Sequence, residues 1–475
     1  MRVVQEDERT VPTAPRPAPS PAGRWRPWVT APVRAVREAP RKPMWIAGAL
    51  AAVSLFGYAL ARHLIGTGMV DMIVYRAEGD AVVHHLDLYG LRVTAANLPA
   101  TYPPFAALLF VPTTWFSVSF LRVAVTGGNV ALLALAALFS FRLTDWPRRE
   151  LRPVGVVLAA GLGVWLEPVY TDLRYGQINL LLLCLVLWDL NVSRERGWKG
   201  VGIGIAAGMK LTPGLFAVYL LVTGRIRAAV TAGATFLATF AVSALVLPDA
   251  SKGFWTKYLY DSSRVGRTDI VDNQSLRGIV ARFEQVHVPG PEAALPVAVI
   301  AVAGLAVAAL LWRDNHRLPR AEAWGACCTA VTALLVSPIS WTHHWVWCVP
   351  LLVLLAAEAD HERTRPAAVR RRRWRPIFVL TLLGFCSFGM WLVPHVGIVN
   401  LRLSLVQQLP AGLYVWIGLC FLTVAAMRVR GRRSAVGRPV VPQPRTASRT
   451  PRPLVAPRTS AEQSLPGERH TPVVR

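Results

Sequence analysis

Long runs of apolar residues fill most of the chain between residues 44 and 427. A helix needs about 20 mostly apolar residues to cross the hydrocarbon core of a bilayer, and 53% of the 475 residues are hydrophobic. The pattern predicts an all-α integral membrane protein with about ten full transmembrane helices plus one broken helix pair. The predicted spans are 44–64, 122–141, 153–168, 176–192, 226–247, 293–312, 322–339, 342–358, 376–394 and 410–427, and the broken pair is 200–222.

Most of the net charge of +25 lies in three basic segments that flank or join the apolar runs. Residues 1–43 carry +5, residues 360–375 carry +5 and residues 428–475 carry +9. Basic segments next to spans are typical of the cytoplasmic side of a membrane. The first and last of them are also rich in proline and lack periodicity, so we expect disordered cytoplasmic tails. No nucleic-acid recognition motif accompanies the charge, and no nucleic-acid partner is expected.

The block VGIGIAAGMKLTPGLFAVYLLVTGR determines the orientation of every later loop. If residues 200–222 crossed the membrane once, Arg225 and Arg227 would face outside, against the charge rule. Lys210 and Pro213 interrupt the block near its middle. We therefore expect two half-helices that enter and leave on the same side, as broken helices do around enclosed cavities.

With that orientation, the polar residues sort onto one face. The predicted outer segments are 65–121, 248–292 and 337–343, and polar residues from all three would meet there with the intramembrane Lys210. This set comprises Asp71, Tyr75, Tyr102, Arg264, Arg267, Asn273, Gln274, Arg277, His343 and His344.

Several of these residues also have an ordinary structural interpretation. Asp71 stands in GMVDMIVYR, where a lone acid is costly unless it is used or paired, but it is also suited to cap a helix. Lys210 is able to extend to the membrane surface or bind a carbonyl oxygen. The two histidines fit an interfacial aromatic belt, and Arg264 and Arg267 fit surface cations.

A metal site is not predicted. Adjacent histidines on a helix point in different directions, which disfavours a two-histidine site. The six cysteines lie in or beside apolar runs and lack zinc or redox spacing. No cofactor is expected.

Five stretches in order give the chain a family resemblance: VDMIVYR with LDLYG, TYPPFAALLFVP, RYGQINLLLLCLVLWDL, GIAAGMKLTPGLFAVYLL, and NQSLRG followed by SPISWTHHWVW. Together they cover about residues 65 to 350. The chain resembles glycosyltransferase family 87, membrane mannosyltransferases of the GT-C fold that use polyprenyl-phosphate-mannose. The resemblance implies a GT-C catalytic domain over residues 44–427.

The resemblance also implies roles for the outer polar residues. Asp71 would be the general base that accepts a proton from an acceptor hydroxyl, and one acid suffices for a single inverting displacement. An apolar setting would raise its pKa toward neutral pH. Cations would meet the lipid phosphate: the candidates are Lys210, Arg264, Arg267, Arg277 and His344. Tyr75, Tyr102, Asn273, Gln274 and His343 would contact substrate.

The expected function is transfer of mannose from polyprenyl-phosphate-mannose to a mannose-containing glycolipid or lipoglycan. The reaction would take place at the outer, extracytoplasmic face of the cell membrane, and α-1,2 is the most common linkage in the family. Two alternatives remain: a flippase or transporter of lipid-linked sugars, and a GT-C enzyme for another sugar. A flippase would not need a lone outer acid beside the first span.

Overall fold

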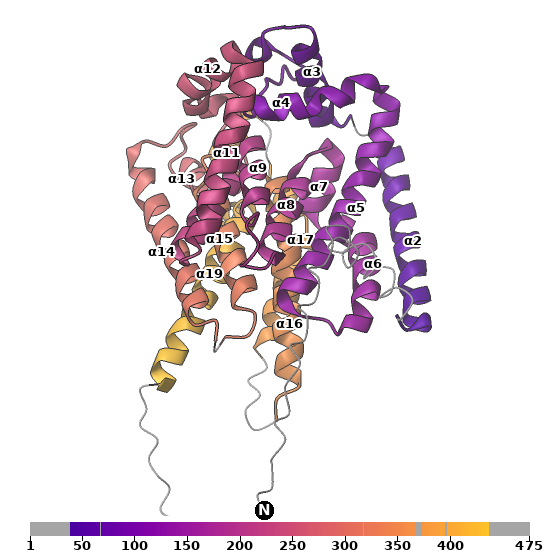
Figure 1. The fold of residues 1–475 in the computed structure, drawn as a ribbon, viewed down its shortest axis with the longest axis vertical. Helices are drawn as coiled ribbons and strands as arrows, with labels where there is room; N and C mark the ends of the chain where they lie inside the picture. Colours follow the sequence, from indigo (N-terminus) through magenta and orange to yellow (C-terminus); the bar gives the residue numbers. More distant parts are fainter. Residues whose placement is uncertain (1–38, 67, 317, 367–372, 395–396, 437–475) are drawn as a thin grey trace, which may run out of the picture. The chain divides into compact units, whose positions relative to one another are not determined.

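The computed structural model describes residues 39–66, 68–316, 318–366, 373–394 and 397–436 (Figure 1). The chain divides into two units, residues 1–431 and residues 432–475, and only the first is described in detail. Most of both predicted tails, and the arginines at 370–372, lie outside the described residues. Within the described ranges the elements are helices, joined by loops and two isolated β-bridges.

Six described helices are long and apolar enough to cross a membrane, and a pair bent by 77° would make a seventh. Each of the six coincides with a predicted span. They are α2 (Arg41–Ile65), α5 (Val118–Thr144), α11 (Ile226–Val246), α14 (Ala294–Arg313), α16 (Cys348–Arg363, preceded by η9, Thr342–Trp347) and α19 (Leu413–Val436).

The other four predicted spans form apolar helices that are too short for this criterion, so ten full spans are not shown. These helices are α6 (Arg152–Leu162), α8 (Asn179–Asn191), α15 (Ala321–Val336) and α17 (Trp374–Cys386). The expected span 153–168 stops early because the chain bends after η4 (Gly163–Trp165) and begins α7 (Glu167–Tyr175) at a new angle. Pro168 favours a helix start there, since proline suits the first turn.

The core centres on α15, which is buried without interruption from residue 323 to residue 335. Its sequence is dominated by Ala, Gly, Cys and Thr, so neighbouring helices approach it closely on all sides. A helix this enclosed can form one wall of an internal cavity.

Two predicted outer segments meet at one end of the first unit. There α3 (Val70–Val83), α4 (Pro104–Phe110) and α12 (Pro248–Thr256) lie together (Figure 1). Arg264 joins the two segments, since its Nη2 donates to the carbonyl oxygen of Tyr89 over 2.7 Å.

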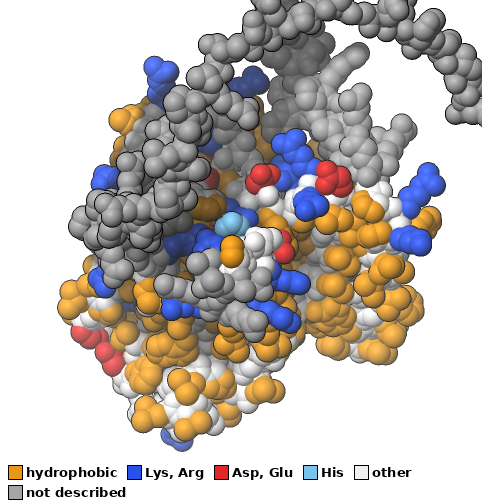
Figure 2. Space-filling model, turned by 90° about the horizontal axis from the view of Figure 1, so that it is seen from below, with side chains coloured by type: hydrophobic (Ala, Val, Ile, Leu, Met, Phe, Trp, Pro, Cys, Tyr) orange, Lys and Arg blue, Asp and Glu red, His pale blue; other side chains and the backbone are white. Residues whose placement is uncertain are grey.

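Loops with exposed arginines meet at the opposite end. The Trp146 indole donates to Asp360 over 3.0 Å, and Arg320 donates to the Thr144 carbonyl over 3.0 Å. Viewed from this end, Lys and Arg side chains gather on the face, and hydrophobic side chains cover the flanks (Figure 2). The structure thus separates the basic loops from the predicted outer segments, as the charge pattern requires.

The block 200–222 breaks where the sequence predicts. It forms α9 (Val201–Met209), a break at Lys210 with extended backbone, a short turn η5 (Thr212–Gly214) and α10 (Leu215–Val222). Three glycines pack α9 against α11. A Cβ atom at Gly200 would lie 2.2 Å from the Ala228 carbonyl oxygen. One at Gly204 would lie 2.5 Å from the Thr235 Cβ, and one at Gly208 would lie 2.2 Å from the Thr239 hydroxyl oxygen.

Successive glycines of this segment meet successive residues of α11, so α9 and α11 run parallel. A turn of only three residues, 223–225, joins α10 to α11, so α10 runs antiparallel to both. Arg194 before α9 and Arg225 after α10 both lie over the Trp312 ring, with guanidinium carbons 4.2 Å and 4.4 Å from its centroid. The segments on either side of the broken pair therefore meet at the same ring, Trp312.

This arrangement predicts the accessibility of two exposed arginines. In a background without the six cysteines, Arg196→Cys and Arg227→Cys should both resist an impermeant maleimide in intact cells and react after permeabilisation. Asp261→Cys, also exposed but at the predicted outer side, should react in intact cells. Labelling of only one of the two arginine positions from outside would show that residues 201–222 cross the membrane once.

Candidate active site

Asp71 is the second residue of α3 and makes a long-range hydrogen bond. Its Oδ2 accepts from Gln177 Nε2 over 2.7 Å. The N-cap of α3 is Met69, and no side chain caps this helix end. The capping interpretation of Asp71 is therefore wrong, and its carboxylate instead contacts the segment between α7 and α8.

Gln177 is held in a single orientation. Its Oε1 accepts from the hydroxyl groups of Tyr75 over 2.7 Å and Tyr102 over 3.1 Å. Its backbone carbonyl accepts from Asn129 on α5 over 3.1 Å. Because the amide oxygen accepts hydrogen bonds from both phenol groups, the amide nitrogen must point at Asp71.

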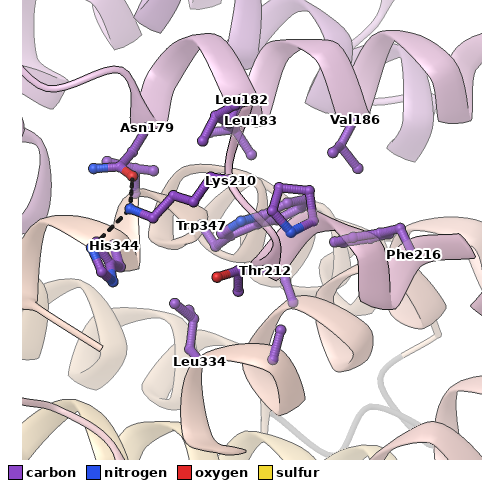
Figure 3. A pocket seen from close by; sticks show the side chains of 14 residues that line it. Asn179, Leu182, Leu183, Val186, Lys210, Thr212, Phe216, Leu334, His344 and Trp347 are labelled. Carbon is purple, nitrogen blue, oxygen red and sulfur yellow. Dashed lines mark hydrogen bonds between the residues drawn. The ribbon is translucent and has the colours of Figure 1, made fainter. Parts of the chain in front are cut away.

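Lys210, at the break between α9 and α10, joins the same network (Figure 3). Its Nζ donates to Asn179 Oδ1 over 2.9 Å and lies 3.0 Å from His344 Nε2 and 3.4 Å from the Tyr102 hydroxyl. An ammonium group only donates, so His344 accepts through Nε2 as a neutral ring. The Lys210 side chain turns toward this network instead of extending to a surface, and within the described structure it binds no backbone carbonyl oxygen; its contacts are side chains from three separate segments.

A pocket opens beside Lys210, with about 480 Å³ of empty space including its mouth. Its polar end is formed by Asn179, Lys210, Thr212 and His344 (Figure 3). Its remaining walls come from α8, α10, α15 and η9, and they are mainly apolar: Leu182, Leu183, Val186, Phe216, Ala330, Leu334, Val346 and Trp347. The cavity therefore suits a ligand with a charged head and an apolar tail.

Asp71 is placed to take up a proton near neutral pH. Burial raises the pKa of its carboxyl to about 6, although the Gln177 hydrogen bond and the positive charge of Lys210 lower it. Above about pH 6 the group is a carboxylate, which is the form that accepts a proton.

The three predicted arginines lie away from this network. Arg264 holds the Tyr89 and Ala100 carbonyl oxygens and packs over the Tyr258 ring. Arg267 forms an ion pair with Asp269 and keeps the pKa of that carboxyl below its usual value, against the effect of burial. Within the described part of the chain, Arg277 has no hydrogen bond or ion pair.

Asn273 and Gln274 are fully buried, and their hydrogen bonds connect neighbouring loops. Asn273 donates to the Thr268 carbonyl over 2.8 Å and accepts from the Ser340 amide over 2.9 Å. Gln274 donates to the Ala411 carbonyl over 2.7 Å. The structure does not bring either residue to the pocket or to Asp71.

His343 lies beside the network. Its ring meets those of Tyr175 and His344 edge to face, with centroids 5.5 Å and 4.9 Å apart. Its Nε2 is buried and finds no hydrogen-bond partner among the described residues.

Sequence reasoning missed the two amides that connect the predicted residues. Gln177 and Asn179 stand two residues apart in RYGQINL, at the start of the apolar helix α8. Asn179 also donates to Asp172, a fully buried acid whose second oxygen is unpartnered in the described structure. The sequence signal that could have identified these two residues is the one that pointed to Asp71: polar side chains beside an apolar run need hydrogen-bond partners.

Across the described residues, no group of three or more His, Cys, Asp or Glu side chains could hold a metal ion. The charges near Asp71 come instead from Lys210 and from the neighbouring acids.

Comparisons with known proteins agree with the family resemblance. The model of glycosyltransferase family 87 matches residues 100–338. A protein of Mycobacterium tuberculosis (strain CDC 1551 / Oshkosh), named polyprenol-phosphate-mannose-dependent alpha-(1-2)-phosphatidylinositol pentamannoside mannosyltransferase, is 38% identical over 67% of this chain and 72% of its own length. A phosphatidylinositol mannoside mannosyltransferase of strain ATCC 25618 / H37Rv, also named polyprenol-phosphate-mannose-dependent, is 30% identical over 82% of this chain and 92% of its own. No solved structure matches the chain.

The pKa of Asp71 can be measured directly. A carbodiimide reacts with protonated carboxyl groups, so labelling of Asp71, followed by mass spectrometry, should decline with a midpoint near pH 6. Gln177→Glu removes the amide donor and adds a negative charge, so the midpoint should move to higher pH. Asn97→Asp adds the same charge at an exposed position and should leave the midpoint unchanged. An equal midpoint in the Gln177→Glu variant would contradict the described hydrogen bond.

Proposed function

Because the chain belongs to glycosyltransferase family 87, we propose that it is a polyprenol-phosphate-mannose-dependent mannosyltransferase whose active site is the network from Asp71 to His344. Its acceptor is a mannosylated lipid of the phosphatidylinositol mannoside type, and the new linkage is α-1,2, as in the names of its relatives.

The pocket beside Lys210 is the observation that carries this assignment to particular residues. The donor joins a phosphate to a long apolar chain, and the pocket joins a cation to apolar walls. Lys210 binds the phosphate with a charge-assisted hydrogen bond, assisted by Thr212 and Asn179. The polyprenyl chain lies along Leu182, Phe216 and the other apolar walls.

The reaction is a single displacement at the anomeric carbon of mannose. Asp71 accepts the proton of an acceptor hydroxyl as its oxygen forms a bond to that carbon. The bond from carbon to phosphate oxygen breaks, and its electron pair leaves with the phosphate, where Lys210 stabilises the growing charge. The phosphate needs no acid catalyst, so one carboxylate is sufficient. Inversion at a β-linked donor gives the α-linked product.

Sidedness and architecture belong to the same proposal. The end with α3, α4 and α12 faces the extracytoplasmic side, and the basic end faces the cytoplasm. The four short apolar helices complete ten crossings of a GT-C domain over residues 44–427. The α9–α10 pair is re-entrant from the cytoplasmic side, which carries Lys210 inward to the height of the pocket.

Asp71→Asn tests the catalytic role. Asparagine keeps the size of the side chain but loses the basic carboxylate, so transfer should fall by ~10²–10⁴-fold. Asp80→Asn provides the matched control, because Asp80 is on the same helix but pairs with His84 near the surface. Mannose transfer from polyprenyl-phosphate-mannose to a phosphatidylinositol mannoside would be measured with purified protein. Full activity of a folded Asp71→Asn variant would exclude Asp71 as the base, and a flippase would also tolerate the change.

Lys210→Met tests donor binding. Loss of a charged hydrogen bond costs about 1.5–3 kcal/mol, so KM for the donor should rise by roughly 10- to 100-fold while KM for the acceptor stays near its original value. Lys252→Met removes a lysine from the exposed surface of α12 and should change neither constant. Reduced expression with normal kinetics would assign Lys210 a structural role only.

A further inference from the structure

Glu78 is a second acid on the face of α3 that carries Asp71. The two residues are seven positions apart, and Tyr75 lies between them, four after Asp71 and three before Glu78. Residues at this spacing stack along one side of an α-helix. Since Tyr75 donates to Gln177, this side of α3 faces the active-site network.

The Glu78 side chain is buried beneath the elements that pack on α3. Only 2% of the residue is exposed, and within the described structure its carboxyl group makes no hydrogen bond or ion pair. Asp80, two residues later, is 44% exposed at its side chain and lies 3.4 Å from the His84 ring. A buried, unpartnered carboxyl is costly as an anion, so Glu78 is expected to keep its proton unless a ligand changes its surroundings.

The elements packed on α3 bring several titratable groups toward Glu78, and Arg264 lies over the Tyr89 ring. α4 and η2 (Val111–Trp115) pack on α3 and contribute no titratable side chain. η1 (Leu88–Gly90) contributes Tyr89, and α7 contributes Glu167, Asp172, Arg174 and Tyr175 on the side near Asp71.

Tyr102 and the carboxyl group of Asp71 complete these surroundings. The charge of Glu78 raises the pKa values of Tyr89 and Tyr102, so both rings are close to it. Burial, followed by the negative charge of Asp71, raises the pKa of Glu78 to about 8. At neutral pH the group is therefore an uncharged hydrogen-bond donor.

Glu78 lies on the acceptor's side of the reaction. The positive charge of Lys210 lowers the pKa of Asp71, whereas among the described residues the pKa of Glu78 is shifted by Asp71, so Glu78 lies farther than Asp71 from the Lys210 end of the site. In an inverting displacement the incoming oxygen approaches opposite the leaving group. Seven residues of helix span roughly 10 Å, which is too far for both carboxyl groups to contact the same hydroxyl.

We propose that Glu78 donates a hydrogen bond from its protonated carboxyl group to a hydroxyl of the acceptor glycan, on the sugar next to the one that Asp71 deprotonates. This inference rests on the proposed function. It makes Glu78 a residue that recognises a mannosylated acceptor, and leaves the chemistry to Asp71.

Steady-state kinetics with polyprenyl-phosphate-mannose and an octyl dimannoside acceptor test the proposal. Glu78→Leu fills a similar volume without a donor, so KM for the acceptor should rise by roughly 5- to 10-fold, the effect of about one neutral hydrogen bond, with KM for the donor unchanged. Glu78→Gln retains an N–H donor and should keep the original acceptor KM. Asp80→Asn is the control on the same helix.

The pH dependence gives a second, independent measurement. In the unmodified protein KM for the acceptor should rise as pH passes about 8, because Glu78 then loses its proton. Glu78→Gln has no proton to lose and should not show this rise. The proposal is overturned if the rise persists in Glu78→Gln, or if a folded Glu78→Leu variant keeps its acceptor KM. Should Glu78→Leu not fold, the Gln variant alone decides. Absence of any mannose transfer by the unmodified protein would refute the proposed function instead.

Discussion

The hydrogen bonds of the Lys210 ammonium group organise this protein. A cation at the middle of an apolar block is expensive unless it is paired or solvated, and here Asn179, His344 and Tyr102 surround it. These three residues come from α8, η9 and the segment before α4, which are far apart in the chain. The break between α9 and α10 is thus the place where these segments are held together, and the pocket forms beside it.

Gln177 has a comparable role on the other side of the site. Two phenols donate to its side-chain oxygen and so determine which end of its amide faces Asp71, while Asn129 donates to its backbone carbonyl. The result is a carboxylate that receives one donor and otherwise remains free to act. Its pKa reflects the balance between burial, which favours the neutral form, and the charge of Lys210, which favours the anion.

The residues that the sequence revealed are those that carry charge in an apolar setting. Asp71 and Lys210 were predicted because each violates the surrounding pattern, and the broken pair followed from the charge rule for loops. Gln177 and Asn179 were not predicted, because a neutral amide in a polar-to-apolar boundary is common and gives no charge signal. Arg264 and Arg267 illustrate a limit of this signal: a cation in an outer loop suggests a phosphate site, but a carbonyl oxygen or a neighbouring acid also satisfies it, as here. The helix lengths near the site were also beyond the sequence, since hydropathy does not report where a bend interrupts an apolar run.

The glycine contacts between α9 and α11 have a mechanical consequence. Because Gly200, Gly204 and Gly208 leave no gap along α11, the height of the Lys210 break is tied to that helix. α11 continues after one residue into α12. With α3 and α4, α12 forms a cap at one end of the first unit, where its Phe254 packs against Tyr89. A tilt of the cap would therefore move the Lys210 end of the pocket with it. The two proposed substrates would then contact parts of the protein that move together. The close contacts of the three glycines with α11 would set how rigidly these parts are coupled.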